Sequence, residues 1–220
     1  MGRAKVARKS TFIDMTAMCD VAFLLLSFFI LTTKFKPAEP IPVTIPSSVA
    51  AKAAPLGENS FLVTISGQGK AFIELGEGEI RQNILDEFEK LKNVKFPPAA
   101  REAFLKSDLI PTSYESLSQY LAMNAEQKKK VDLPGVPVDS SGGELKDWIT
   151  AGLVAYGNDT KKIHFIIKGD NSAKFPVFSH VITAFKKNEV FKYQLLTSPE
   201  GVPEGTELYN KHMKGIKQEN

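Results

Sequence analysis

The sequence is short of the residues that usually carry covalent or metal-dependent chemistry. It has one cysteine, Cys19, and three histidines among 220 residues, so it forms no internal disulfide. The histidines (His164, His180 and His212) lack the spacing of a metal site. Gly67-Gln68-Gly69 and Gly76-Glu77-Gly78 are not followed by the lysine and serine of a phosphate-binding loop. The sequence also shows no recognisable nucleophile–base set. We therefore expect a protein that is not an enzyme, without a catalytic residue, metal site or cofactor.

A strong excess of charge is also missing once the first residues are set aside. The formal net charge is +3, from 28 basic and 25 acidic residues. Arg3, Lys5, Arg8 and Lys9 lie within the first nine residues, which leaves 24 basic against 25 acidic residues in the rest. Proteins that bind nucleic acid usually present a basic patch, so nucleic acid is not an expected partner.

Long apolar runs are rare, and the main one lies near the N-terminus. Residues 17–33 read AMCDVAFLLLSFFILTT. Extended back to Ile13, a helix would be about 31 Å long, enough to cross a hydrocarbon core of roughly 30 Å. We therefore expect a transmembrane helix over residues 13–33. The basic cluster places residues 1–12 in the cytoplasm by the positive-inside bias, with the bulk of the chain across the membrane.

A cleaved signal peptide is the rival interpretation of this segment, because it also combines a basic start with a short apolar run. The small residues that a peptidase would recognise, around residues 49–53, lie some twenty residues beyond the apolar run. The sequence TTKFKP directly after the run is a poor cleavage site. An uncleaved membrane anchor is the favoured interpretation.

Asp20 separates this helix from a plain anchor. A carboxylate inside a membrane span costs about 2.5–3.5 kcal/mol on insertion scales and is functional by default. At 100° per residue, Thr16 lies about 40° from Asp20 around the helix and Ser27 about 20°. Such a polar stripe must face protein or water, so partner helices are expected around it. We predict that Asp20 carries protons, with Thr16 and Ser27 as pore-facing or relay groups; the alternative is that Asp20 sits at the cytoplasmic interface and reaches water.

These motifs together resemble the ExbD/TolR family of proton-channel subunits. The stretch IDMTAMCDVAFLLLSFFILTT from Ile13 is similar to the family's membrane motif, and the resemblance assigns the family's essential aspartate to Asp20. The stretch VTIPSS at residues 43–48 matches a V-x-φ-P-x-S motif (φ, apolar), and residues 163–197 match a strand, helix and strand near the C-terminus. The chain departs from the family at Ala17, where many ExbD sequences have proline, and over residues 93–143, which have no counterpart in the short members.

The resemblance implies partners and a location. An ExbD-like subunit would sit in the bacterial inner membrane, with a periplasmic C-terminal domain. It would assemble as a homodimer inside a pentameric ExbB-like channel and energise a TonB-like protein for transport across the outer membrane. A partner-docking role, as a strand added to partner or sister chains, is implied for Val43, Thr44, Ile45, Pro46, Ser47 and Ser48. Two alternatives remain open: a TolR-like subunit for envelope integrity or constriction, with peptidoglycan as a possible partner, or a non-catalytic anchor or adaptor.

The remainder of the chain predicts an α+β domain behind a proline-rich linker. We expect the linker over residues 34–60, the periplasmic domain over 61–197 with 93–143 as an insertion, and a tail over 198–220. The domain should hold a small sheet with helices on one face, in the order ββα…αβαβ, its last two strands parallel. The expected strands are 61–66, 69–75, 163–168 and 191–197, and the expected helices are 79–92, 114–130, 144–156 and 177–187.

Overall fold

The computed structural model describes residues 15–32, 41–49, 57, 59–76, 78–107 and 109–200. The chain divides into two compact units, Met1–Glu39 and Pro40–Asn220, which are described separately below. The tails expected at residues 1–12 and beyond residue 200 lie outside the described residues, as do Ile13 and most of the linker region from residue 50 to residue 58.

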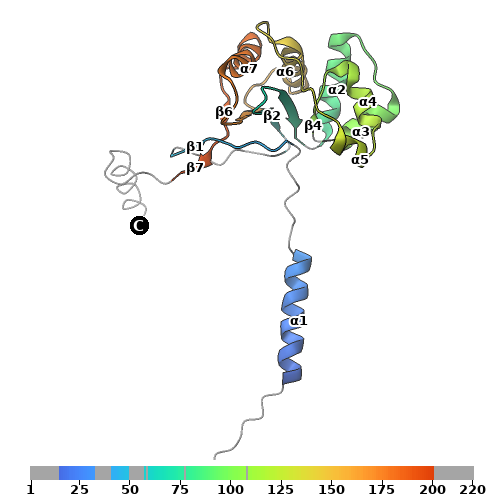
Figure 1. Cartoon of the computed structure of the whole chain (residues 1–220). Helices are drawn as coiled ribbons and strands as arrows, with labels where there is room; N and C mark the ends of the chain where they lie inside the picture. Colours follow the sequence, from blue (N-terminus) through green and yellow to red (C-terminus); the bar gives the residue numbers. More distant parts are fainter. Residues whose placement is uncertain are drawn as a thin grey trace, which may run out of the picture. The chain divides into compact units, whose positions relative to one another are not determined.

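The first unit contains helix α1, Met15–Thr32 (Figure 1). Its 18 residues are long and apolar enough to cross a membrane, and at 1.5 Å per residue they span about 27 Å. Neither glycine nor proline interrupts the segment. This helix fits the expected single-pass anchor of residues 13–33 within the range that is described.

The second unit is built on a five-stranded sheet with the order β4-β3-β2-β5-β6. β2 and β3 form the predicted antiparallel hairpin, with Val63 opposite Ile73. β5 runs parallel to β2, and β6 runs parallel to β5, so the prediction of parallel final strands is confirmed. The bounds are β2 Ser60–Ile65, β3 Ala71–Leu75, β4 Leu109–Ile110, β5 His164–Gly169 and β6 Gln194–Leu195.

Helices cover one face of this sheet (Figure 1). Alternate strand residues such as Phe61, Val63 and Ile167 point into the main core, where they meet the buried side chains of the helices. Trp148 of α6 stacks on Phe88 of α2, with ring centroids 3.7 Å apart. The bounds are α2 Glu79–Lys92, α3 Pro98–Lys106, α4 Tyr114–Ala122, α5 Ala125–Lys130, α6 Gly143–Ala155 and α7 Phe175–Lys187.

Residues 93–143 are integral to this domain. They supply α3, β4, α4 and α5, and their Phe104, Leu117 and Leu121 are buried in the same core as the sheet. The helix predicted over 114–130 is wrong at one point, because Asn124 begins a new helix. Its side chain accepts the N–H of Gln127 at 2.8 Å, and the Gln127 side chain accepts the N–H of Asn124, a capping box that starts α5.

The other face of the sheet is partly covered by the start of residues 41–49. Ile41 is buried in a small cluster with Phe72 and Leu109. Strand β1, Ser47–Ser48, pairs in parallel with β7, Ser198–Pro199, and Figure 1 shows this pair on the side of the sheet away from the helices. Residues 41–49 therefore pack as part of the domain.

Candidate functional site

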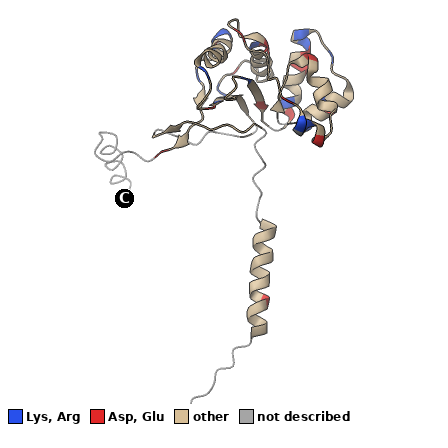
Figure 2. Cartoon of the chain, viewed as in Figure 1, with Lys and Arg blue, Asp and Glu red and all other residues tan. Residues whose placement is uncertain are grey.

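Helix α1 carries a single charged residue, Asp20. Figure 2 shows the helix in tan apart from that one acidic position. Within the first unit taken by itself, no residue of α1 is buried. Hydrocarbon cannot hydrogen-bond a carboxylate. In a membrane, Asp20 therefore requires a surface supplied by partner helices or by water.

Two hydroxyl groups of α1 hydrogen-bond to the backbone of the helix itself. The Ser27 hydroxyl donates to the carbonyl oxygen of Leu24 at 2.9 Å, and the Thr32 hydroxyl donates to that of Phe28 at 2.7 Å. Back-bonding of this kind satisfies a hydroxyl inside an apolar medium. Ser27 keeps only acceptor capacity toward the Asp20 side of the helix. Thr16, Asp20 and Ser27 share one face by helical geometry, and their roles stay predictions.

The motif of residues 43–48, called the docking segment below, is held by the loop after β5. The Thr44 N–H donates to the Asp170 carboxylate at 2.8 Å, and the Asn171 N–H donates to the Thr44 carbonyl at 2.8 Å. Asp170 also accepts the N–H of Ser172 at 2.8 Å and the Ser172 hydroxyl. The Ser172 hydroxyl and N–H, together with the Thr44 N–H, hold the pKa of the Asp170 carboxyl below its usual value.

The second half of the docking segment continues onto the last strand of the domain. The Ser198 N–H donates to the Pro46 carbonyl at 3.0 Å, and the Glu200 N–H donates to the Ser48 carbonyl at 3.1 Å. The Ser47 hydroxyl donates to the Glu200 carboxylate at 2.7 Å. Pro46 has no N–H to offer a strand, so the contact uses its carbonyl. Within a single chain, the docking segment is thus already paired with its own domain.

Sequence reasoning did not identify the partners of this segment. Asp170 lies 126 residues from Thr44, and no local pattern links them. The one available signal was the run GDNS directly after a buried strand, because an aspartate followed by small polar residues favours a side-chain-capped turn. The segment itself was identified, but only through its resemblance to a family motif.

Within the described ranges, no group of three or more His, Cys, Asp and Glu side chains lies close enough together to bind an ion. Cys19 is exposed on α1, next to Asp20 in sequence but about 100° from it around the helix. The polar groups of α1 are therefore the Asp20 carboxylate, the serine and threonine hydroxyls and the Cys19 thiol.

The comparisons with known proteins bear on both the helix and the domain. A family model described as "Biopolymer transport protein ExbD/TolR" matches residues 7–200. The match runs from before α1 through the docking segment to the end of β7. No curated protein matches the chain, and no solved structure does.

Proposed function

We propose that this chain, which belongs to the ExbD/TolR family of biopolymer transport proteins, is the ExbD-type subunit of a proton-driven inner-membrane motor. Membership supports the broader statement that the chain is a proton-channel subunit of a biopolymer-transport complex in a membrane. The proposal adds the residue that carries the proton and the output of the motor. The observation that carries it is Asp20, the one charged residue of the apolar helix α1.

Asp20 would work as a proton carrier that alternates between two charge states. Protonated, the side chain is neutral and compatible with an apolar surrounding; deprotonated, it places a full charge among the partner helices. One elementary charge that crosses 100 mV releases about 2.3 kcal/mol. Because the helix is pushed toward a different arrangement in each charge state, repeated protonation and release can drive motion between α1 and the helices around it.

The proposed assembly has a helical channel around α1 and a periplasmic output. The polar stripe of Thr16, Asp20 and Ser27 would face an ExbB-like pentamer, and two copies of this chain would lie inside it. The α+β domain would pass the motion to a TonB-like protein. The docking segment supports such contacts because its backbone groups already pair with strand β7 of its own domain, and the same pairing can be offered by a sister chain.

The test is Asp20→Asn in cells, with Cys19→Ala as the matched control on the same helix. Asn keeps the shape of the side chain and cannot carry a proton, so TonB-type uptake should fall to background, at least tenfold. Cys19→Ala should keep uptake within about twofold, because position 19 is off the polar stripe. Co-purification with the channel partner checks that both variants assemble.

The result divides the remaining possibilities. If Asp20→Asn assembles and still supports uptake, the proton-carrier role is wrong. If uptake is normal in cells that lack the protein but envelope constriction fails, its output is of the Tol type. Function retained with residues 13–33 replaced by a poly-leucine span would instead identify α1 as an anchor only.

A further inference from the structure

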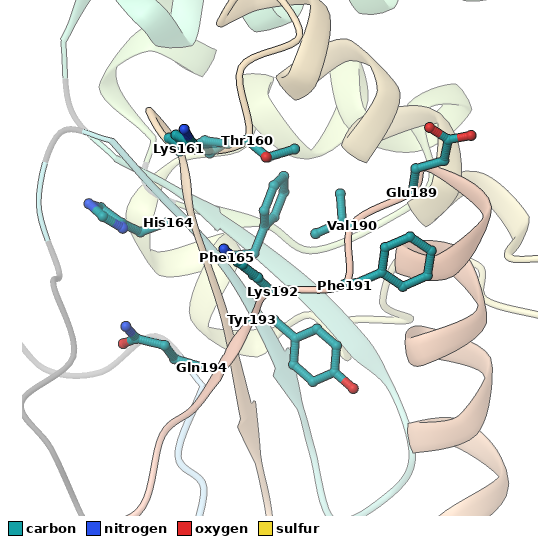
Figure 3. A pocket seen from close by; sticks show the side chains of 11 residues that line it. Thr160, Lys161, His164, Phe165, Glu189, Val190, Phe191, Lys192, Tyr193 and Gln194 are labelled. Carbon is teal, nitrogen blue, oxygen red and sulfur yellow. The ribbon is translucent and has the colours of Figure 1, made fainter.

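A pocket of about 730 Å³ lies where β5 and the chain leading into β6 separate (Figure 3). A strand was expected over residues 191–197, but the ladder pairs only Ile166 with Gln194 and Ile167 with Leu195. The residues before those pairs are not joined in the sheet, which opens the space between them. The lining residues are Thr160, Lys161, Ile163, His164, Phe165, Glu189, Val190, Phe191, Lys192, Tyr193 and Gln194.

The floor of this pocket is apolar and closed. Ile163, Phe165 and Val190 are all buried, with at most 3% of any of them exposed. Their burial ties them to the main core, so the floor is rigid. Beside it, Phe191 is 71% exposed and offers an aromatic face that the domain leaves uncovered. An apolar body that enters the pocket would therefore remove the Phe191 ring from water.

The rim of the pocket is basic on one side. Figure 3 shows Lys161, His164 and Lys192 on the same side of the pocket, together with the Gln194 amide, whereas Glu189 lies on the opposite side. In the part of the chain that the structure describes, no carboxylate forms an ion pair with Lys161 or Lys192. These cations are therefore available to an external anion.

We propose that this pocket binds an organic anion, a carboxylate joined to an apolar body, supplied by an acidic peptide segment or by a small organic acid. The carboxylate would accept charge-assisted hydrogen bonds from Lys161 and Lys192, and the apolar body would cover the exposed ring of Phe191. Small-ligand sites typically have about 300–1,000 Å³, an apolar lining and a few placed polar groups. The pocket meets each of these conditions.

The proposal is independent of proton transport, because the pocket lies in the domain and involves no residue of α1. The experiment uses the full chain in lipid nanodiscs. The first probe is a fluorescent acetyl-Phe-Glu-Phe-Glu-amide, whose binding is followed by anisotropy. The second is 3-phenylpropionate, used as a competitor of the first. A fluorescent acetyl-Phe-Gln-Phe-Gln-amide serves as the neutral probe of equal size.

The decisive variant is Lys161→Ala with Lys192→Ala. Its matched control is Lys186→Ala with Lys187→Ala, which removes the same charge from exposed lysines at the end of α7 outside the pocket lining. We expect the pocket variant to weaken binding of the acidic peptide at least tenfold, because two charge-assisted hydrogen bonds are lost. Binding to the control variant should stay within about twofold of the parent chain. Its two lysines lie outside the pocket, and salt screens interactions between distant exposed charges.

Each outcome of this experiment either supports or overturns the proposed anion site. Equal binding of the acidic and neutral peptides, or equal weakening by the two double variants, would overturn the proposal by showing apolar or nonspecific binding. No effect of the pocket variant would overturn it as well. If the pocket variant alone loses binding, the site is an anion site. Competition by 3-phenylpropionate at concentrations near the peptide's own Kd would then assign a small organic acid as the source, and weak competition would assign a peptide.

Discussion

The domain and helix α1 treat their polar groups in opposite ways. Inside the domain, buried polar side chains are satisfied by the chain itself. Arg81 is 3% exposed and donates to the carbonyl oxygens of Leu75 and Leu105 at 2.9 Å and of Gly76 at 3.2 Å. In the described residues, no fully buried side-chain nitrogen or oxygen lacks a hydrogen bond. On α1, by contrast, Asp20 is a charged residue in an apolar helix that offers it no ionic partner of its own.

This difference shows where a substitution should change stability and where it should change assembly. In a domain whose polar groups are internally paired, substitutions should act on stability. A membrane helix with a charged residue in its span requires partners around that charge. Substitutions on α1 should therefore act on assembly and proton transport. Substitutions in the domain should therefore lower its stability, whereas one substitution on α1 should make membrane insertion more favourable.

The largest loss of stability is expected at Trp148. Its ring is fully buried, stacks on Phe88 at 3.7 Å and lies 6.1 Å from Phe104, so it joins α6 to α2 and to the inserted α3. Trp148→Ala should destabilise the domain by about 3–5 kcal/mol, measured by urea unfolding followed by circular dichroism. Phe191→Ala, which removes an exposed aromatic ring, should change stability by less than about 0.5 kcal/mol. A similar loss from both would mean that α6 is not the centre of the core.

The opposite sign is expected on α1. Asp20→Leu replaces a residue that opposes insertion by about 2.5–3.5 kcal/mol with one that favours it. Insertion of α1 should become more favourable by about 3 kcal/mol, whereas proton-driven activity should be lost. A translocon insertion assay measures the first quantity, with Ser27→Ala as a control of small effect. A gain below about 1 kcal/mol would instead place Asp20 at the membrane interface.

A smaller loss of stability is expected at Glu144, which ties the inserted helices to the rest of the domain. This carboxylate is 8% exposed. It accepts hydrogen bonds from the Ser113 hydroxyl at 2.7 Å, the Tyr114 N–H at 2.9 Å and Trp148 Nε1–H at 2.9 Å. Glu144→Ala leaves these donors unsatisfied and should cost about 2–3 kcal/mol.

The control for this prediction is Glu115→Ala, an exposed acid on α4 that should stay within about 0.5 kcal/mol of the parent chain. If Glu144→Ala unfolds no more easily than Glu115→Ala in urea, the carboxylate does not link α4 to α6.

The features that could be predicted from sequence are those whose physical cause is local. The spacing of Ile80, Ile84, Phe88 and Leu91 predicts one helical face, and α2 begins and ends at the predicted residues, Glu79 and Lys92. The cost of a charge in an apolar run singles out Asp20 in the same way. The membrane roles of Thr16 and Ser27 also rest on such local geometry and stay predictions.

Other features depend on contacts that no short pattern contains. α3 has nine residues and a weak apolar pattern, and it forms because Ala100 and Phe104 are buried against the core. β6 is shorter than predicted, since its pairing is limited to two residues of β5. The contact of Thr44 with Asp170 joins residues far apart in the chain, so the docked position of residues 43–48 could not be predicted from the sequence.

The smallest effect is expected from substitution of Asp170. It tests whether the docking segment is held against its own domain. The hydrogen bonds that lower the pKa of this carboxyl favour its charged form. Their contribution to stability is therefore present above the unfolded pKa of 3.8 and is lost as the pH falls through the lower folded pKa.

At neutral pH, Asp170→Ala should raise amide hydrogen exchange in residues 43–48 by about threefold to tenfold, while exchange in β2 and β5 stays unchanged. Asp139→Ala is the control, because the Ser141 hydroxyl and N–H and the Gly143 N–H lower the pKa of Asp139 in the same way. Among the described residues, Asp139 forms no hydrogen bond with the docking segment. Exchange that rises equally in both variants would show general loosening, and fast exchange already present in the parent chain would mean that the docking segment is free for a partner.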